Sequence, residues 1–178
     1  MNVPARYRLP IAILASIAVV VLIFAAVALV SQPRPSDSPS PSPSPSASVD
    51  PTSSPEGVVR AFFDALARAR RTDDPTLLTP FVTSTVSSAY LTASGFLEGQ
   101  KQVGKASVIT TNELRDLRVD TQDGEAVVTF THQMEGYDID YDTGEPLESP
   151  TALPDVTVRV EVRQVDGRWL VDRFENMP

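Results

Sequence analysis

An uninterrupted apolar run occupies residues 11–30, where IAILASIAVVVLIFAAVALV contains no charged residue and Ser16 is the only polar one. As an α-helix, a run of this length spans about 30 Å, which matches the hydrocarbon core of a bilayer. A buried helix of a soluble domain is the alternative, but no other segment is apolar enough to surround it. We therefore predict a transmembrane helix over residues 11–30, so any soluble domain must be built from the rest of the chain.

The charges that precede the apolar run predict its orientation. Arg6 and Arg8 lie just before it, and basic residues favour the cytoplasmic side of a membrane. The sequence thus predicts a cytoplasmic tail over residues 1–10 and a single-pass protein of the cell membrane whose C-terminal part is extracytoplasmic. A cleaved signal peptide is the competing interpretation, because Ala26-Val27-Ala28 has the small-x-small pattern of a cleavage site. Both interpretations place the C-terminal part outside the cytoplasm.

Residues 31–55 form a low-complexity segment that contains ten Ser and eight Pro. Such a segment has almost no apolar surface to bury, so folding cannot offset its loss of conformational entropy. Repeated Pro favours the extended polyproline II conformation. We expect a disordered Pro/Ser-rich linker that acts as a spacer, and its hydroxyl groups are candidate attachment sites for sugars.

Composition narrows the function of the remaining domain, residues 56–178. The 178-residue chain has no Cys, one His and a formal net charge of -8. The lack of Cys excludes a disulfide scaffold, a thiolate metal site and a cysteine nucleophile, and a single His excludes a His-rich zinc site. The negative charge argues against nucleic-acid binding, which needs a basic surface. Phosphate-binding, metalloprotease and nucleophile-elbow motifs are also missing, so no catalytic residue, cofactor or metal ion is predicted.

The domain is expected to open with an amphipathic helix. Ser54 and Pro55 are favourable at a helix N-terminus, and an apolar stripe follows them at helical spacing. The members of the stripe are Val58, Val59, Phe62, Phe63, Leu66 and Ala69. Asp64 lies four residues from both Arg60 and Arg68, which predicts an exposed ion pair and counts against a catalytic role for Asp64.

Two shorter helical segments are expected next. Asp74-Pro75 has the cap and first-position Pro of a short second helix. Thr79-Pro80 repeats this signal and predicts a third helical stretch that passes through Tyr90 towards Leu97. The domain thus begins with three helices.

The rest of the domain has the alternation of apolar and polar residues that is typical of half-buried strands. Strands are expected over residues 106–111, 115–121, 125–134, 156–162 and 168–174. Asp123-Gly124 and Asp166-Gly167 each predict a two-residue hairpin turn. Helices followed by antiparallel strands predict an α+β domain in which the helices cover one face of the sheet.

This order of elements resembles the nuclear transport factor 2-like superfamily, which includes SnoaL-type cyclases and ketosteroid isomerases. The similar residues are the opening helix Glu56–Leu66, the Asp74-Pro75 entry followed by Leu77-Leu78, and the closing segment Asp166–Val171. The resemblance covers most of residues 56–175 and implies a cone, with three helices in the concavity of a strongly curved antiparallel sheet. These are core and turn residues, so they indicate architecture and not chemistry.

A cavity inside such a cone is the expected place for a ligand, because enzymes of the superfamily place polar groups on its wall. His132 is the best candidate, since it shares a strand face with Phe130 and Met134 and has Tyr90 as a candidate neighbour. We take these four residues as the candidate lining. His132 is a general base, a core-edge histidine with one hydrogen-bond partner, or a histidine exposed beside a bulge at Gly136. A non-catalytic role is favoured because no carboxylate partner can be assigned to it.

An acidic run offers a second candidate site. The segment Tyr137-Asp138-Ile139-Asp140-Tyr141-Asp142 alternates strictly, which places three carboxylates on one face of a strand. Calcium is the ligand that such a cluster suggests, but Gly144 falls one position late for an EF-hand loop and Ser149 replaces its bidentate Glu. A solvated edge-strand face, whose like charges discourage edge-to-edge pairing, is therefore favoured over a metal site.

Two functions remain open. The chain has 13 Arg and only 2 Lys, a bias that resembles proteins of high-GC bacteria such as actinobacteria. A single-pass anchor with such a head resembles assembly subunits of type IV secretion systems and membrane proteins associated with actinobacterial lipid importers. This resemblance implies a non-enzymatic extracytoplasmic module that binds an envelope protein or a cell-wall partner. The alternative is a small-ligand binder or a lyase/isomerase that uses the cone cavity; one His and no paired cavity acids favour the first.

Overall fold

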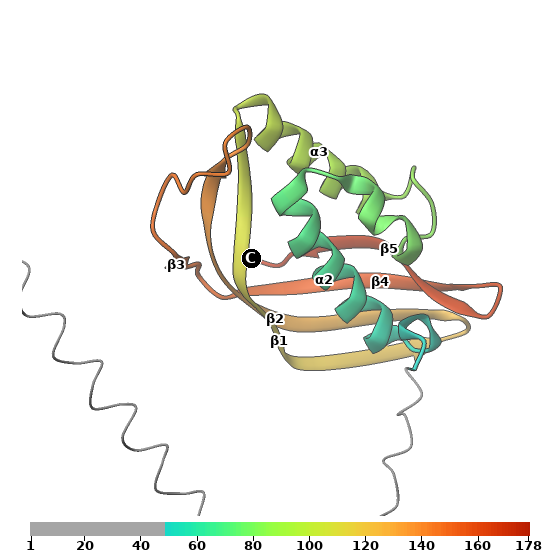
Figure 1. Ribbon diagram of the computed structural model, residues 1–178. Helices are drawn as coiled ribbons and strands as arrows, with labels where there is room; N and C mark the ends of the chain where they lie inside the picture. Colours follow the sequence, from blue (N-terminus) through green and yellow to red (C-terminus); the bar gives the residue numbers. More distant parts are fainter. Residues whose placement is uncertain (1–48) are drawn as a thin grey trace, which may run out of the picture. The chain divides into compact units, whose positions relative to one another are not determined.

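The computed structural model describes residues 49–178. The predicted cytoplasmic tail, the transmembrane helix and most of the linker lie outside the described residues, and no helix within 49–178 is long and apolar enough to cross a membrane. The elements are η1 (Pro51–Ser53), α2 (Pro55–Thr72), η2 (Pro75–Phe81), α3 (Ser88–Gln102), β1 (Lys105–Gln122), β2 (Glu125–Asp140), β3 (Thr151–Ala152), β4 (Val156–Val165) and β5 (Arg168–Asn176). Helical segments followed by strands confirm the predicted α+β class (Figure 1).

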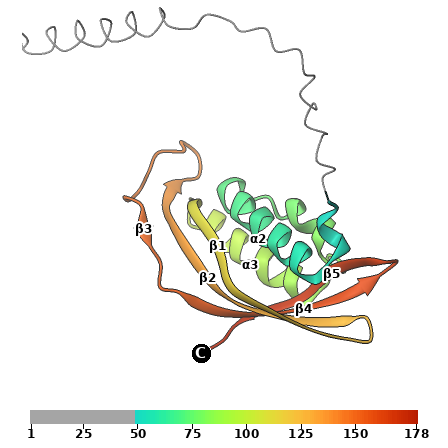
Figure 2. The same cartoon turned by 90° about the horizontal axis from the view of Figure 1, so that it is seen from below.

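The strands form one antiparallel sheet in the order β1-β2-β4-β5, with the short β3 paired to β2. The sheet curves strongly around α2 and α3, which lie in its concavity (Figure 2). The β1–β2 pairing shifts register between Ile109 and Thr111 and between Arg115 and Arg118. Because bulges bend a strand without ending it, the two strands expected over residues 106–111 and 115–121 are a single strand, β1.

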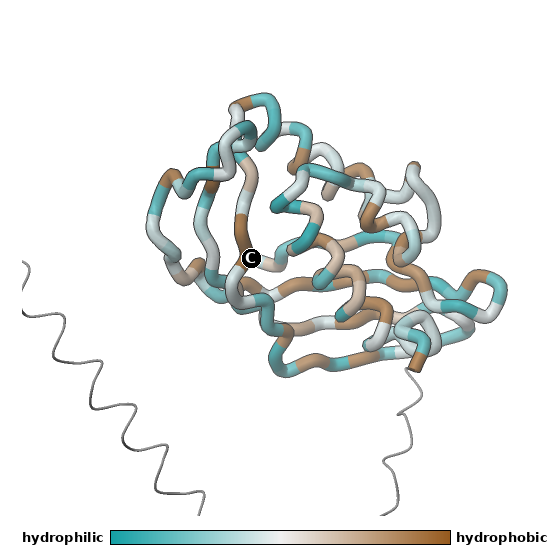
Figure 3. The backbone as a smooth tube through the Cα atoms, in the orientation of Figure 1, coloured by the Kyte–Doolittle hydropathy of each residue, from teal (hydrophilic) through white to brown (hydrophobic). Residues whose placement is uncertain are grey.

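The core is the interface between the apolar stripe of α2 and the concave face of the sheet. Every predicted member of the stripe is buried. The ring of Phe63 packs edge-on against Phe130 of β2, with ring centroids 5.2 Å apart, and Phe62 contacts Phe174 of β5 at 5.6 Å. The strands contribute alternate residues to this layer, and the apolar positions of α2 and of the strands below it are visible in Figure 3. Their buried side chains are Ala126, Val128, Phe130, Val158, Val160, Val162 and Val171.

The third helix begins later than the sequence indicates. Val82 forms a parallel bridge with Val171 of β5, and the Thr83 N–H donates to the Val171 carbonyl over 2.9 Å. This extended pairing interrupts the helical stretch that was predicted to start after Thr79-Pro80. Helix α3 starts at Ser88, after Ser87, whose hydroxyl accepts from the Tyr90 N–H.

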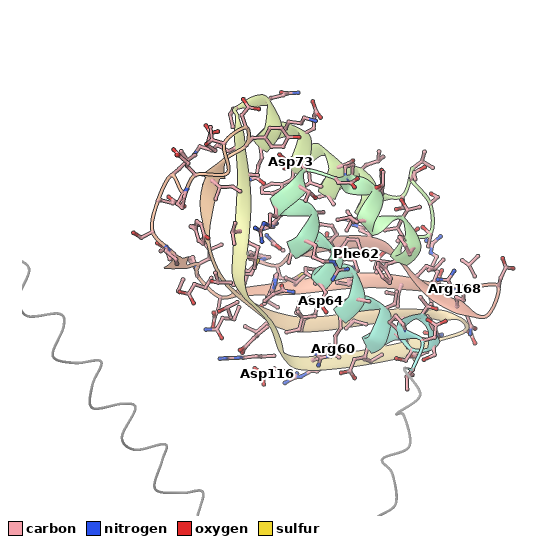
Figure 4. All side chains as sticks on the ribbon, in the orientation of Figure 1. Arg60, Phe62, Asp64, Asp73, Asp116 and Arg168 are labelled. Carbon is pink, nitrogen blue, oxygen red and sulfur yellow. The ribbon has the colours of Figure 1, made fainter. Side chains whose placement is uncertain are left out.

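The folded domain also begins earlier than residue 56, the boundary expected from the sequence. Thr52 in η1 is buried, and its hydroxyl accepts a hydrogen bond from Arg168 Nε over 3.1 Å. Arg168, labelled in Figure 4, also donates through Nη2 to the Pro80 carbonyl. Residues 51–55, which composition groups with the linker, are therefore attached to the β4–β5 hairpin and are part of the head.

Two glycines on the helices provide a test of this attachment. A Cβ added at Gly57 of α2 would meet the Pro51 carbonyl and would lie 2.9 Å from Ser54 Oγ, whereas one added at Gly95 of α3 would meet nothing within 4 Å. We expect Gly57→Ala to lower the free energy of unfolding by about 1–3 kcal/mol, because the backbone of η1 must move. Gly95→Ala should raise it by about 0.5–1 kcal/mol, because alanine restricts the unfolded chain.

The measurement is urea unfolding of the full chain in detergent, followed by the fluorescence of Trp169, the only tryptophan. If Gly57→Ala is as stable as Gly95→Ala, then η1 is not fixed against α2.

Candidate functional site

A small cavity lies where the C-terminal half of α2 faces the bent part of β1 and β2. We call it the α2–β1–β2 site. Its lining residues are Phe63, Leu66, Ala67, Arg70, Ile109, Asn112, His132 and Met134. The volume open to the centre of a water molecule is about 10 Å³, which is about the minimum that one water molecule requires. The cone is therefore packed nearly shut at this point.

His132 lies on the core face of β2, where alternation places it in line with the buried Val128 and Phe130. Its side chain is only 5% exposed, and its ring stands edge-on to Phe63 with centroids 5.0 Å apart. Burial, with a smaller contribution from the charge of Arg70, lowers the pKa of His132 from 6.5 to about 4. The imidazole is therefore neutral at pH 7.

A hydrogen-bond chain fixes this imidazole. Asn112 Nδ2 donates to Asp64 Oδ1 over 2.9 Å, and Asn112 Oδ1 faces His132 Nε2 at 2.8 Å. A carboxylate and an amide oxygen only accept, so Nε2 of His132 must carry the proton. The unprotonated nitrogen of the neutral ring is then Nδ1.

This chain orients His132 more than it activates it. An imidazole with a pKa near 4 is a weak base at neutral pH, whereas an effective general base has a pKa near the working pH. The link from Asp64 passes through an amide, so the carboxylate does not touch the ring. The arrangement agrees with the expected core histidine, and it adds the Asp64–Asn112 link that sequence reasoning missed.

Asp64 itself has a different partner from the one predicted. The expected ion pair with Arg60 or Arg68 is wrong, because Arg60 pairs with Glu56 one turn earlier, with Nη2 and Oε1 2.9 Å apart. Asp64 instead reaches across to β1 (Figure 4), and helical spacing alone could not show that Asn112 lies opposite it.

Arg70 is the third polar residue that lines the site, and it was not among the residues predicted from the sequence. Its Nη1 lies 3.7 Å from Met134 Sδ, and its guanidinium carbon lies 4.7 Å from the centre of the Phe96 ring. Its Nε is buried and has no hydrogen-bond partner among residues 49–178. Burial lowers the pKa of Arg70. The sequence feature that could have identified Arg70 is its spacing, because position 70 falls on the apolar face of the helix one heptad after Phe63.

The four candidate lining residues do not lie together. His132 and Met134 line the α2–β1–β2 site. Phe130 lies deeper on the same strand face, with its ring centroid 6.1 Å from that of His132. Tyr90 packs against the core from α3 and is not among the residues that line this cavity.

The acidic run ends β2 and forms the turn after it. Asp140 Oδ1 accepts from the Thr143 N–H over 2.8 Å and from the Asp142 N–H over 3.1 Å, and these bonds lower the pKa of Asp140. Gly144 completes the turn with a φ of 72°. Within the part of the chain that the structure describes, no group of three or more His, Asp or Glu side chains is placed to hold a metal ion.

The convex face of the sheet carries a wider and polar hollow. Arg159, Glu161 and Arg163 alternate with the buried valines of β4 and thus point away from the core. Arg159 pairs with Glu161 at 2.6 Å and with Glu175 of β5 at 3.3 Å. A hollow of about 570 Å³ lies beside them, and its remaining polar lining is Asp120, Gln122, Asp123 and Glu125.

Comparison with known proteins identifies the fold. No family model matches the chain, and no curated protein matches it significantly in sequence. Among solved structures, the intermembrane space region of the chloroplast protein ARC6 superposes with a TM-score of 0.52 at 14% identity, covering 68% of this chain and 92% of that one. The fold is nuclear transport factor 2-like.

Two further structures belong to the same group. A candidate dehydratase of the NTF2-like family from Streptomyces avermitilis has a TM-score of 0.49 at 14% identity and covers 68% of this chain and 91% of that one. An NTF2-like protein with a cystatin-like fold from Novosphingobium aromaticivorans has a TM-score of 0.44 at 14% identity and covers 66% and 77%. At 14% identity, the likeness to the ARC6 region shows the fold and leaves the function open.

The lowered pKa of His132 predicts how stability depends on pH. Between pH 6.5 and about 4 the unfolded chain binds a proton at His132 and the folded chain does not. The contribution of the neutral His132 to the free energy of unfolding is therefore complete above pH 6.5. It is lost as the pH falls towards 4, at about 1.4 kcal/mol per pH unit. Between pH 7 and pH 4.5 the wild type should lose about 2 kcal/mol more free energy of unfolding than His132→Gln, which has no titrating ring.

Denaturant unfolding of both full-length proteins at the two pH values measures this difference. Parallel losses in the two proteins would mean that the imidazole is not buried as a neutral group.

Proposed function

We propose that this protein is a non-enzymatic binding or assembly module of a bacterial, and specifically actinobacterial, cell envelope, tethered to the membrane by residues 11–30 with its NTF2-like head outside the cytoplasm. The observation that carries the proposal is the closed cone. A space of about 10 Å³ leaves no room for a substrate in the described conformation. The single histidine in it is a weak base that donates its Nε2 proton to Asn112.

The polar hollow on the convex face supports recognition by the surface. It offers both signs of charge on a rigid sheet, with Arg159 and Arg163 beside Glu161 and Glu125. Mixed charges at an interface favour specificity and fast association over raw affinity. Such a surface suits a polar envelope protein or a cell-wall partner. The ARC6 region carries the same fold in an intermembrane space, so the fold also serves outside the cytosol.

A second candidate function is a small-ligand binder or a lyase/isomerase that uses the cone. The Asp64–Asn112–His132 chain favours it, because a fixed tautomer leaves Nδ1 as the basic atom of the ring. An opened site would also raise the pKa of His132 towards its usual value, because water would solvate the imidazolium.

Charge reversal distinguishes the two functions. Arg159→Glu on the convex face should abolish co-purification of an envelope partner with the tagged full-length chain, and should lower stability by about 1–2 kcal/mol because it loses two half-buried ion pairs. Arg68→Glu, on the exposed side of α2, is the matched control and should retain the partner. Crosslinking in cells followed by affinity capture is the measurement.

His132→Gln separates surface binding from chemistry. The variant should keep the partner and any cellular phenotype of the gene, whereas loss of a general base would reduce a rate by about a hundredfold or more. A folded, partner-bound His132→Gln protein that is functionally dead would reverse the ranking of the two functions.

The tether has its own prediction. A reporter enzyme that is active only outside the membrane, fused after Pro178, should be active, because Arg6 and Arg8 hold the N-terminus inside. The same fusion lacking residues 2–30 should be inactive. An inactive but stably expressed full-length fusion would exclude an extracytoplasmic head.

A further inference from the structure

Arg70 carries a positive charge into the α2–β1–β2 site, and within the described residues no acidic side chain lies within 4.0 Å of it. The ion pairs of the head involve other residues, and Arg70 Nε is buried without a hydrogen-bond partner. Its guanidinium contacts the Met134 sulfur and the Phe96 ring. Arg70 as a whole is partly exposed, but its buried Nε is a donor of a charged group that has no acceptor, which is unfavourable. An anion beside the guanidinium would supply both the acceptor and the opposite charge.

The other lining residues indicate which chemical groups the rest of the ligand would carry. Asn112 and His132 form a polar wall that is already bound to Asp64. The remaining lining is apolar, since Phe63, Leu66, Ile109 and Met134 surround the same space. The site thus combines one cation with a neutral histidine and an apolar wall.

We propose that the α2–β1–β2 site binds a small carboxylate that carries an apolar group, with Arg70 as its ion-pairing residue. A single guanidinium neutralises one negative charge, which fits a carboxylate better than a dianionic phosphate. The fork of the guanidinium matches the two carboxylate oxygens, and Nε is one of its donors. The apolar group of the ligand would lie against Phe63 and Leu66.

Phe96 does not line the cavity, but it covers the Arg70 guanidinium, so we expect it to move when an anion reaches Arg70. Its ring lies over the Arg70 guanidinium and is 45% exposed, so one edge already contacts solvent. Rotation of this side chain exchanges a cation–π contact, worth about 0.5–2 kcal/mol, for an ion pair.

This inference deepens the second candidate function above, the small-ligand binder, and it requires the cone to open from the closed conformation described there. It assigns a ligand class to the cone without requiring turnover, because His132 remains a fixed and weakly basic neighbour. A carboxylate site can exist whether or not the convex face binds an envelope partner.

The test is calorimetric titration of the full-length chain in non-ionic detergent at pH 7 with isobutyrate, isobutyramide and inorganic phosphate. We expect saturable binding of isobutyrate and none of the amide, with phosphate at least about tenfold weaker. Arg70→Met should weaken isobutyrate binding at least about tenfold and should raise the melting temperature of the free protein by several degrees, because it removes a buried donor that has no acceptor. Arg68→Met, an exposed arginine of the same helix, is the matched control and should change neither.

Two more variants keep the test decisive if Arg70→Met does not fold. Arg70→Lys keeps the charge but loses the fork, so binding should weaken by less than in Arg70→Met. Phe96→Ala removes the cover, so the bulkier phenylacetate should bind more tightly than to the wild type. A tripeptide ending in Val, as free acid and as amide, distinguishes a free small acid from the C-terminus of a protein.

Three results would overturn the proposal. They are no binding of any of these acids to the wild type at about 10 mM, unchanged isobutyrate binding in Arg70→Met and Arg70→Lys, and equal binding of the acid and the amide.

Discussion

Burial of the apolar stripe of α2 in the concavity of the sheet is the contact on which the rest of the domain depends. Phe62 contacts Phe174 of β5, and its neighbour Phe63 contacts both Phe174 and Phe130 of β2, so one turn of helix joins strands β2 and β5. An aromatic pair of this kind contributes about 0.5–1.5 kcal/mol beyond the apolar area that it buries. The curvature that the bulges of β1 give the sheet lets both contacts form together.

The same contact explains why two polar residues of the cone have lowered pKa values. Because α2 fills the concavity, His132 and Arg70 are enclosed between the helix and β2, and the pKa values of both fall with burial. His132 is compensated by Asn112, whereas Arg70 has only a ring and a sulfur beside it. His132 is thus satisfied by the fold, and Arg70 is the residue that we propose pairs with a ligand.

The parts of this fold that could be predicted from the sequence are those set by residues close together in the chain. Caps such as Ser54 and Asp74, the stripe of α2, and the Asp123-Gly124 and Asp166-Gly167 turns depend on neighbours in sequence, and each occurs as its residue type dictates. The expectations that differ depend on distant segments. Val82 is extended because Val171 of β5 pairs with it, and Thr52 is ordered because Arg168 donates to it.

The candidate site also has a part that local sequence patterns could predict and a part that they could not. Strand alternation was sufficient to place His132 on the core face with Phe130, because side-chain direction in a strand repeats every two residues. It could not place Asn112 or Arg70 beside His132, since these lie on another strand and on a helix and meet only when the sheet curls around α2. The order of helices and then strands, the identity of the core faces and the scarcity of acid–base residues could be predicted from the amino-acid sequence, because they follow from local period and composition. Three features required the folded chain: the nearly closed cone, the bond of Asp64 to Asn112 and not to an arginine, and the lack of an acidic partner for Arg70 within residues 49–178. Packing between elements that are far apart in the chain fixes burial and pairing, so local sequence patterns could not show them.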